Sequence, residues 1–218
     1  MKKRLTLLAS ALAIGFVLLL SACLEKAIEN ETSTANDDSI MKVDFPKMSV
    51  QLWSVNSTLA EDFKGTLQSI ADMGFDAVEF AGDFGPYSDD PQGLKGFLNE
   101  LGLEISGAHV SMRHFSEEKA EQTIAFYQAI GAPMLIVPSA AEAFDADKID
   151  GWIDRLNVLQ KQVAKSGMRF GFHNHDEEFL PYGDGTFWDH LAKKTNDEFV
   201  LQMDVGWVTF AGKDPVKF

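Results

Sequence analysis

The chain has 218 residues, a formal net charge of −14 and a hydrophobic content of 45%. This length and composition allow one globular domain with a sizeable core. The acidic balance argues against nucleic acid as a partner, because binding phosphate groups needs a basic surface.

Residues 1–22 are predicted to be a lipoprotein signal peptide. A Lys-Lys-Arg start at residues 2–4 precedes an apolar run over residues 5–20, an order typical of secretory signals. The run is short for a stable membrane span. The segment Leu20-Ser21-Ala22-Cys23 resembles a bacterial lipobox, in which the cysteine becomes lipidated; an ordinary signal peptide with a chance cysteine is the alternative. Cys23 is the only cysteine, so no disulfide can form within the chain.

Residues 23–45 are predicted to be a disordered tether, because the stretch from Glu25 to Ser39 is mostly polar and offers little to bury. In the lipoproteins that this signal resembles, an aspartate after the cysteine retains the protein in the inner membrane. Leu24 stands at that place. The resemblance therefore implies an exported lipoprotein, held by its lipid at the periplasmic face of the outer membrane.

Residues 46–218 contain one pattern four times: an amphipathic helix, a glycine, a short gap and a β-rich run. The glycines are Gly74, Gly102, Gly131 and Gly167. Glycine just past a helix end takes the left-handed conformation that other residues resist. A period near 30 residues is the length of one βα unit. The sequence therefore predicts repeated βα units over this domain.

The predicted strands are short and mostly apolar, as parallel strands covered by helices are. They span residues 49–53, 77–80, 104–109, 134–137, 169–173 and 199–204. Alternating helices and strands indicate an α/β fold. The first strand leads to no glycine-rich phosphate loop, which disfavours a dinucleotide-binding sheet and favours a (β/α)8 TIM barrel. The chain reaches Phe218 after six strands, so we expect an incomplete barrel with about six of eight units.

Polar residues stand where the predicted strands end. In a parallel barrel these ends form the active-site face. Converging His, Asp and Glu side chains suit a divalent metal such as Mn²⁺, Zn²⁺ or Mg²⁺, and a carboxylate or imidazole can move a proton. The candidates are Glu79, His109, His173, His175 and Asp204.

Three further residues are candidates for substrate binding. Trp53 and Trp207 are predicted to stack on sugar faces or to close the barrel mouth, and Glu178 follows the fifth strand. Each candidate also has a structural interpretation, since polar side chains are common at exposed strand ends. The two remaining histidines, His114 and His190, are predicted to be structural.

The ordered set of motifs over residues 48–218 resembles the xylose isomerase-like TIM barrels, a superfamily of sugar phosphate isomerases/epimerases that includes AP endonucleases of family 2. The segments that carry the resemblance are Ser49-Val50-Gln51-Leu52-Trp53, Gly74-Phe75-Asp76-Ala77-Val78-Glu79-Phe80, Gly107-Ala108-His109-Val110, Gly171-Phe172-His173-Asn174-His175-Asp176-Glu177-Glu178-Phe179 and Gln202-Met203-Asp204-Val205-Gly206-Trp207.

The resemblance implies a set of metal ligands at the strand ends. The family usually places a carboxylate after strand five, an aspartate after strand six, and a histidine and a glutamate after the last two strands. Asp204 matches the aspartate, and His173 stands where the first carboxylate is usual. This departure leaves open whether His173 or His175 is the ligand. The other two ligands have no counterpart in this sequence. From their residue types and strand-end positions, we expect His109, His175 and Glu79 to be the residues that move the proton.

The resemblance implies a divalent-metal-dependent sugar isomerase or epimerase that removes a proton next to a carbonyl. We expect an unphosphorylated sugar or keto-sugar, because export and the lack of a basic cluster disfavour a sugar phosphate. A 3-keto-glycoside lyase or hydrolase using the same site is an alternative. Further alternatives are a non-catalytic sugar-binding lipoprotein and an inactive fragment. An apurinic endonuclease shares the barrel, but the acidic net charge disfavours it.

Overall fold

The computed structural model describes residues 46–218, of which Lys47–Phe218 forms one compact unit. The signal peptide, the tether and Cys23 predicted from the sequence lie outside the described residues. Among residues 46–218, no helix is both long and apolar enough to cross a membrane.

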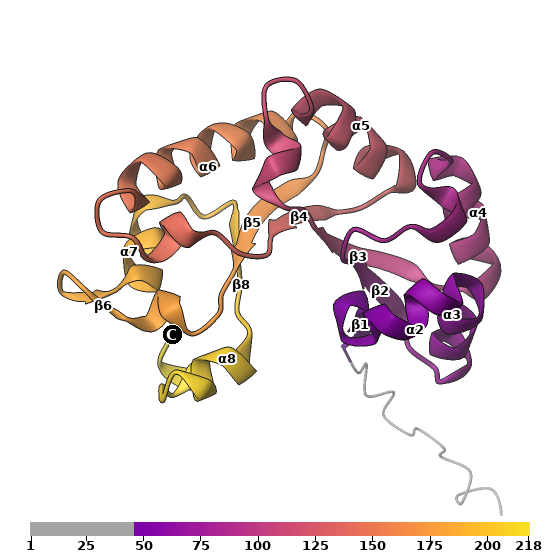
Figure 1. Cartoon of the computed structure of the whole chain (residues 1–218), viewed down its shortest axis with the longest axis horizontal. Helices are drawn as coiled ribbons and strands as arrows, with labels where there is room; N and C mark the ends of the chain where they lie inside the picture. The colour runs from indigo at the N-terminus through magenta and orange to yellow at the C-terminus, as the bar shows by residue number, and fades with distance from the viewer. Residues whose placement is uncertain (1–45) are drawn as a thin grey trace, which may run out of the picture. The chain divides into compact units, whose positions relative to one another are not determined.

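One parallel sheet forms the centre of this unit (Figure 1). Its strands are, in order across the sheet, β1 (Ser49–Gln51), β2 (Ala77–Phe80), β3 (Glu104–His109), β4 (Met134–Val137), β5 (Arg169–His173) and β8 (Phe199–Gln202). Every neighbouring pair is parallel. The predicted α/β barrel fold is confirmed: the sheet is the larger part of a TIM barrel, with β1 and β8 at its two edges within the described residues.

Helices follow the strands and cover one face of the sheet, as the arc of ribbons in Figure 1 shows. The α-helices are α2 (Asn56–Glu61), α3 (Phe63–Asp72), α4 (Pro91–Leu101), α5 (Ala120–Ile130), α6 (Ile149–Ala164), α7 (Phe187–Lys194) and α8 (Val205–Phe210). Short 3-10 turns cover Leu52–Val55 (η1), Gly85–Tyr87 (η2), Met112–Phe115 (η3), Ala141–Phe144 (η4), Glu177–Phe179 (η5) and Pro215–Lys217 (η6). A small antiparallel hairpin pairs β6 (Pro181–Tyr182) with β7 (Gly185–Thr186).

Glycine ends the helices as the sequence predicts. Gly102 follows α4 with φ +71° and Gly131 follows α5 with φ +87°, both in the left-handed region. The other two glycines of the pattern, Gly74 and Gly167, also have positive φ. The chain can therefore turn from each helix directly into the next strand.

Alternate residues of each strand face opposite sides of the sheet. Phe172 packs against Trp152 of α6, with ring centroids 4.8 Å apart, so this side of β5 faces the helices. Buried apolar side chains from the strands and helices form one core on that side. The next residue, His173, therefore faces the concave side, where the polar strand ends gather.

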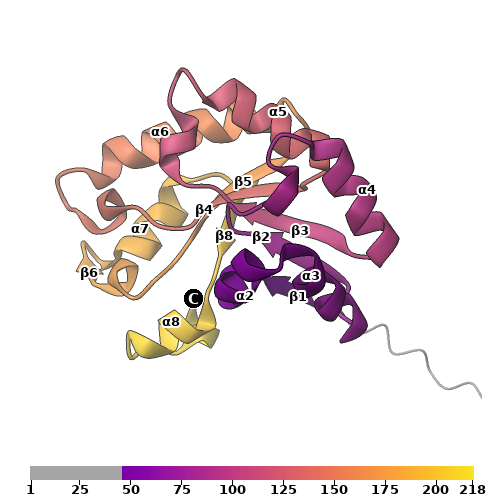
Figure 2. The ribbon, with the colours of Figure 1, turned by 45° about the vertical axis from the view of Figure 1, so that its right-hand side comes forward.

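Two predicted strands are too long at their carboxyl ends. Strand β1 ends at Gln51 rather than residue 53, because the Gln51 side chain accepts the N–H of Trp53 and the backbone turns into η1. Strand β8 ends at Gln202 rather than residue 204, because Asp204 caps the next helix by accepting the N–H of Trp207 at 3.0 Å. Figure 2 follows β8 into α8.

Candidate active site at the carboxyl ends of the strands

Glu79 lies on the concave face of β2, and its carboxylate is held from two sides. Gln51 of β1 donates from Nε2 to Oε2 at 3.2 Å. Gln202 of β8 donates from Nε2 to Oε1 at 2.6 Å. Glu79 lies opposite Gly107 of β3, where an added Cβ would meet its Oε1 at 3.0 Å. The missing side chain at Gly107 therefore makes room for the carboxylate.

Two histidines from β3 and β5, the strands on either side of β4, share one acceptor, the carboxamide oxygen of Gln202. His109 Nε2 of β3 lies 2.7 Å from Oε1, and His173 Nδ1 of β5 lies 3.2 Å from the same atom. The two imidazole rings are 4.9 Å apart, and His109 Nε2 is also 3.5 Å from Oε2 of Glu79. Strands β2, β3, β5 and β8 thus contribute to one connected cluster.

Asp204 follows β8 and faces His173, with 3.9 Å between Oδ2 and Nε2. Its backbone is fixed by the fully buried Asn174, whose Oδ1 accepts the N–H of Asp204 at 2.7 Å while Nδ2 donates to its carbonyl at 3.2 Å. The side chain of one strand end therefore sets the position of the neighbouring strand end.

His175 lies between the cluster and an aromatic surface. Its ring is 5.2 Å from His173 and 5.1 Å from Trp207, and Trp207 is in turn 5.6 Å from Phe210. Trp207 is 36% exposed. The site therefore has an apolar platform beside its imidazoles.

Glu178 is buried next to the backbone of His175. It is 2% exposed, and its Oε2 accepts the backbone N–H of His175 at 2.7 Å. Burial raises the pKa of the Glu178 carboxyl to about 7, although the N–H of His175 opposes this shift. The carboxyl supports the loop that carries His175, and its contact with a substrate stays a prediction.

Trp53 is 68% exposed on η1, and its contact with the cluster runs through its backbone N–H to Gln51. A role in stacking on a sugar stays a prediction for this side chain. His114 lies in η3, and His190 in α7 contacts Asp150 at 2.8 Å, so both lie in elements other than the strand ends.

The surroundings of His173 favour the neutral form of its imidazole. Burial, followed by repulsion from His109 and His175, lowers the pKa of His173 to about 4, against the opposing effects of Asp204 and Gln202. A neutral imidazole has one N–H and one free lone pair, and metal ions bind the lone pair.

His173 and Asp204 have the chemistry of two metal ligands. An imidazole whose second nitrogen is held by a hydrogen bond is the usual form of a ligating histidine, and His173 Nδ1 has such a partner in Gln202. Within residues 46–218, no three His, Cys, Asp or Glu side chains are placed to hold an ion. The pair fits part of a metal site, which water, substrate oxygens or other ligands would complete.

Sequence reasoning missed Gln51, Gln202 and Asn174, although all three hold the site together. Gln202 had a detectable signal, since it is the polar residue that ends the otherwise apolar run Phe199-Val200-Leu201. Asn174 gave no such signal, because its partner Asp204 is 30 residues away in the sequence.

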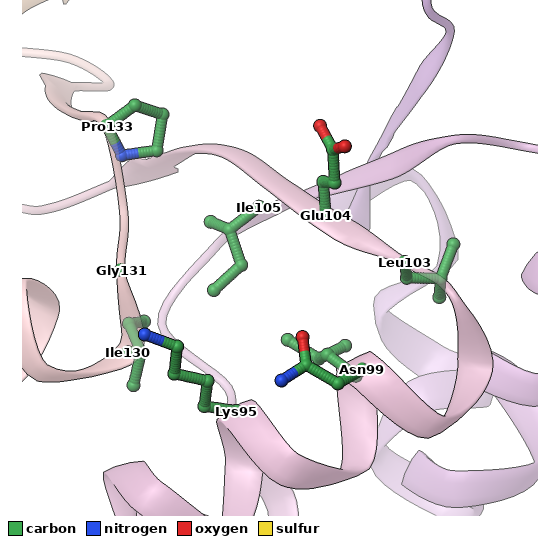
Figure 3. A pocket seen from close by; sticks show the side chains of 9 residues that line it. Lys95, Asn99, Leu103, Glu104, Ile105, Ile130, Gly131 and Pro133 are labelled. Carbon is green, nitrogen blue, oxygen red and sulfur yellow. The ribbon is translucent and has the colours of Figure 1, made fainter.

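A pocket of about 380 Å³ lies at the other end of the strands (Figure 3). Leu103 and Glu104 at the start of β3, Pro133 before β4, and residues of α4 and α5 line it. In TIM barrels the amino-terminal ends of the strands serve stability, and the chemistry lies at the carboxyl ends. This pocket is therefore separate from the cluster around Gln202.

Comparisons with known proteins agree with this fold. A sugar phosphate isomerase/epimerase from Parabacteroides distasonis has a similar structure, with a TM-score of 0.63 and 25% identity over 84% of this chain and 73% of that one. A xylose isomerase-like TIM barrel protein from Mycobacterium smegmatis, solved with magnesium, has a TM-score of 0.54 and 15% identity over 76% of this chain and 66% of that one.

A curated relative is the 3-dehydroshikimate dehydratase of Pseudomonas putida, which is 26% identical over 134 residues. The match covers 57% of this chain and 20% of the dehydratase, so this chain spans about a fifth of the length of that relative. The model of the xylose isomerase-like TIM barrels matches residues 67–217. The chain therefore belongs to the family of xylose isomerase-like TIM barrels.

Proposed function

We propose that this protein is a divalent-metal-dependent enzyme of the sugar isomerase/epimerase type, which removes a proton next to the carbonyl of an unphosphorylated sugar or keto-sugar. The observation that carries the proposal is the convergence of Glu79, His109 and His173 on Gln202 at the carboxyl ends of the strands. This face is where TIM barrels place their chemistry.

The metal would be held by Nε2 of His173 and the carboxylate of Asp204. It would supply a positive charge that binds adjacent substrate oxygens and stabilises negative charge developing on the carbonyl oxygen. The magnesium in the structure of the Mycobacterium smegmatis relative supports a divalent ion in this fold. The candidate metals are Mn²⁺, Zn²⁺ and Mg²⁺.

His109, His175 and Glu79 are the proposed proton-transfer groups. His175 is the group proposed to act directly on the substrate, because its ring contacts both His173 and the exposed Trp207. His109 and Glu79 are linked through Gln202 and by their own 3.5 Å approach, so they can share a proton deeper in the site.

The substrate class follows from the character of the groups around the site. The cluster consists of amide, carboxylate and imidazole groups, and the platform beside it is aromatic. Aromatic faces stack on the apolar faces of sugar rings, whereas a phosphate is usually bound by arginine or lysine. These features support a neutral sugar or keto-sugar over a sugar phosphate.

Elimination by the same site is the second candidate, as in a 3-keto-glycoside lyase. The similarity to a 3-dehydroshikimate dehydratase favours it. An elimination next to a carbonyl begins with the same proton removal, so the residues would have the same roles. Product analysis separates the two: rearrangement gives an isomer of equal mass, whereas elimination gives a smaller product.

The proposed cellular location is the periplasmic face of the outer membrane, where a lipid on Cys23 would anchor the protein. The positive start, the apolar run and the lipobox-like segment support it. Labelling cells with a radioactive fatty acid should label the wild-type protein and leave Cys23→Ala unlabelled. Equal labelling of both proteins would contradict the lipid anchor.

Proton removal next to a carbonyl is tested most directly by solvent exchange. The full chain with Mn²⁺ and candidate keto-sugars in ²H₂O should incorporate deuterium at the carbon next to the carbonyl, as read by mass spectrometry. Asp204→Asn should reduce the rate at least about 100-fold, the size typical for loss of a charge-stabilising group. This variant retains the side-chain oxygen that caps α8.

Asp214→Asn is the matched control, because Asp214 also caps a short helix through its Oδ1 and lies in the segment after α8. It should exchange at the wild-type rate. Exchange that continues unchanged after chelation and in Asp204→Asn would refute the metal-dependent reaction.

A further inference from the structure

Gln202 links both histidines of the cluster to Glu79, yet the proposed reaction gives it no contact with the substrate. Its carboxamide contacts three side chains from three other strands: Glu79 of β2, His109 of β3 and His173 of β5. An amide has one accepting oxygen and one donating nitrogen. Its orientation therefore decides which nitrogen of each imidazole carries a proton.

The directions of the hydrogen bonds in the cluster follow from one backbone N–H, which orients Gln51, and from the Glu79 carboxylate, which orients Gln202. The N–H of Trp53 can only donate, so the side-chain atom of Gln51 that it contacts at 2.6 Å is the oxygen. The NH₂ group of Gln51 therefore faces Glu79. The other oxygen of Glu79 is 2.6 Å from Gln202, where a carboxylate requires a donor. The NH₂ group of Gln202 must point to Glu79 and its oxygen to the histidines.

This orientation makes both histidines donors to the same oxygen. His109 carries its proton on Nε2, and His173 carries its proton on Nδ1. Nε2 of His173 is then the unprotonated nitrogen, and it faces Oδ2 of Asp204 at 3.9 Å. That distance is too long for a hydrogen bond, so the lone pair remains free.

We propose that Gln202 is a positioning residue that selects the tautomers of His109 and His173, and thereby keeps Nε2 of His173 unprotonated beside Asp204. The use that the protein makes of this tautomer rests on the proposed function, since a divalent ion would bind the lone pair beside the carboxylate. Its physical content, the two tautomers, is independent of any reaction.

Asp204 favours the opposite tautomer of His173. A carboxylate near Nε2 attracts a proton to that nitrogen, and the Nε2–H form of His173 could donate to Asp204 after a small movement. The Gln202 oxygen holds the proton on Nδ1 instead. Removal of this oxygen should therefore invert the tautomer of His173.

The tautomers can be read by two-bond ¹H–¹⁵N correlation spectra of the full chain, ¹⁵N-labelled on histidine and free of metal. The wild type should show a protonated Nδ1 and an unprotonated Nε2 for His173, and a protonated Nε2 for His109. Gln202→Met, which keeps the length of the side chain and removes its polar atoms, should move the His173 proton to Nε2. A wild-type His173 with its proton on Nε2 would overturn the inference without any variant.

Gln51→Met is the matched control, because it removes the other amide partner of Glu79 and leaves the bonds between Gln202 and the histidines in place. It should retain the wild-type tautomer of His173. Inversion in Gln51→Met as well as in Gln202→Met would show that any disturbance of Glu79 changes the tautomer, and would overturn the specific role of Gln202.

Titration with Mn²⁺ alone, followed by calorimetry, separates this inference from the proposed function. Gln202→Met should bind Mn²⁺ about 10–100-fold more weakly than the wild type, the range found for residues that orient a ligand. Equal affinity of the two proteins would overturn the role of Gln202 toward the metal. A wild type that binds no Mn²⁺ but shows the expected tautomers would refute the metal in the proposed function and uphold the tautomer selection.

Discussion

The carboxamide of Gln202 on β8 donates to the carboxylate of Glu79 on β2 at 2.6 Å, although three strands lie between them in the sheet. Neighbouring strands are about 4.8 Å apart, so a flat sheet would separate these two strands by roughly 19 Å. Two side chains cannot span that distance. The bond therefore requires the sheet to curl around its concave face, and the polar cluster exists because of this curl.

Replacing Glu79 by Gln should destabilise the protein by about 1–3 kcal/mol, the cost of a buried polar group left without a partner. Gln51 and Gln202 each donate an NH₂ group to one carboxylate oxygen. A glutamine at position 79 has one oxygen, so one of these donors would face another NH₂ group. Urea denaturation followed by circular dichroism measures the change.

Glu104→Gln is the control for this variant. Glu104 is also on a strand of the sheet, but its ion pair with Lys47 is exposed, and exposed pairs contribute little. Its urea midpoint should match that of the wild type. Equal midpoints for Glu79→Gln and the wild type would show that the carboxylate does not hold the two amides together.

Replacing Asn174 by Ala should lower the stability by about 1–3 kcal/mol and also the rate of solvent exchange into the substrate. The fully buried side chain both donates to and accepts from the backbone of Asp204, and loss of these bonds leaves an unpaired N–H. Asp204 would then no longer be fixed beside His173. Asn157→Ala is the control. It removes an amide of α6 that donates to the Lys194 carbonyl at 3.1 Å, and Asn157 is not at a strand end.

The exchange rate is the decisive measurement, because both asparagine variants lose hydrogen bonds. Asn174→Ala should lose rate even under conditions where it is fully folded, whereas Asn157→Ala should retain it. Folded Asn174→Ala with the wild-type rate would contradict the positioning of Asp204.

Glu178 should make the stability depend on pH between about 4.5 and 7. Its pKa is about 7 in the folded protein and near 4.5 without burial, so the folded state holds the proton over this window. Stability therefore falls as the pH rises from 4.5 through 7, by on the order of 3 kcal/mol once the carboxyl is fully ionised. Below pH 4.5 the carboxyl is protonated in both states and contributes no slope.

Glu178→Gln should remove this contribution while its oxygen still accepts the N–H of His175. The difference in unfolding free energy between variant and wild type should therefore grow by roughly 3 kcal/mol from pH 4.5 to pH 8. The exposed neighbour Glu177, replaced by Gln, should show the wild-type slope. Parallel curves for Glu178→Gln and the wild type would mean that the folded-state pKa is not raised.

The sequence was sufficient to predict the four strands β2 to β5 with their observed bounds, because each is a short β-rich run that starts two or three residues after a glycine that ends a helix. It also placed Glu79, His109 and His173 at the strand ends. The hydrogen-bond partners could not be predicted. Gln51 and Gln202 meet Glu79 only when the sheet curls, and Trp53 left the first strand because a side-chain cap overrode its β propensity.

A substitution at Gly171 tests how closely the curl of the sheet brings β5 and β8 together. An added Cβ at Gly171 of β5 would lie 2.0 Å from the carbonyl oxygen of Val200 on β8, and backbone cannot move aside as a flexible side chain can. Gly171→Ala should therefore cost at least about 2 kcal/mol of stability by overpacking, and displace Gln202 from His173.

Gly96→Ala is the matched control, since Gly96 lies within α4 and an added Cβ there meets no atom within 4 Å. It should raise the stability by about 0.5–1 kcal/mol through its better helix propensity. Thermal and urea unfolding of both variants measure these opposite changes, and a Gly171→Ala protein as stable as the wild type would show that β5 and β8 are not in close contact at this point.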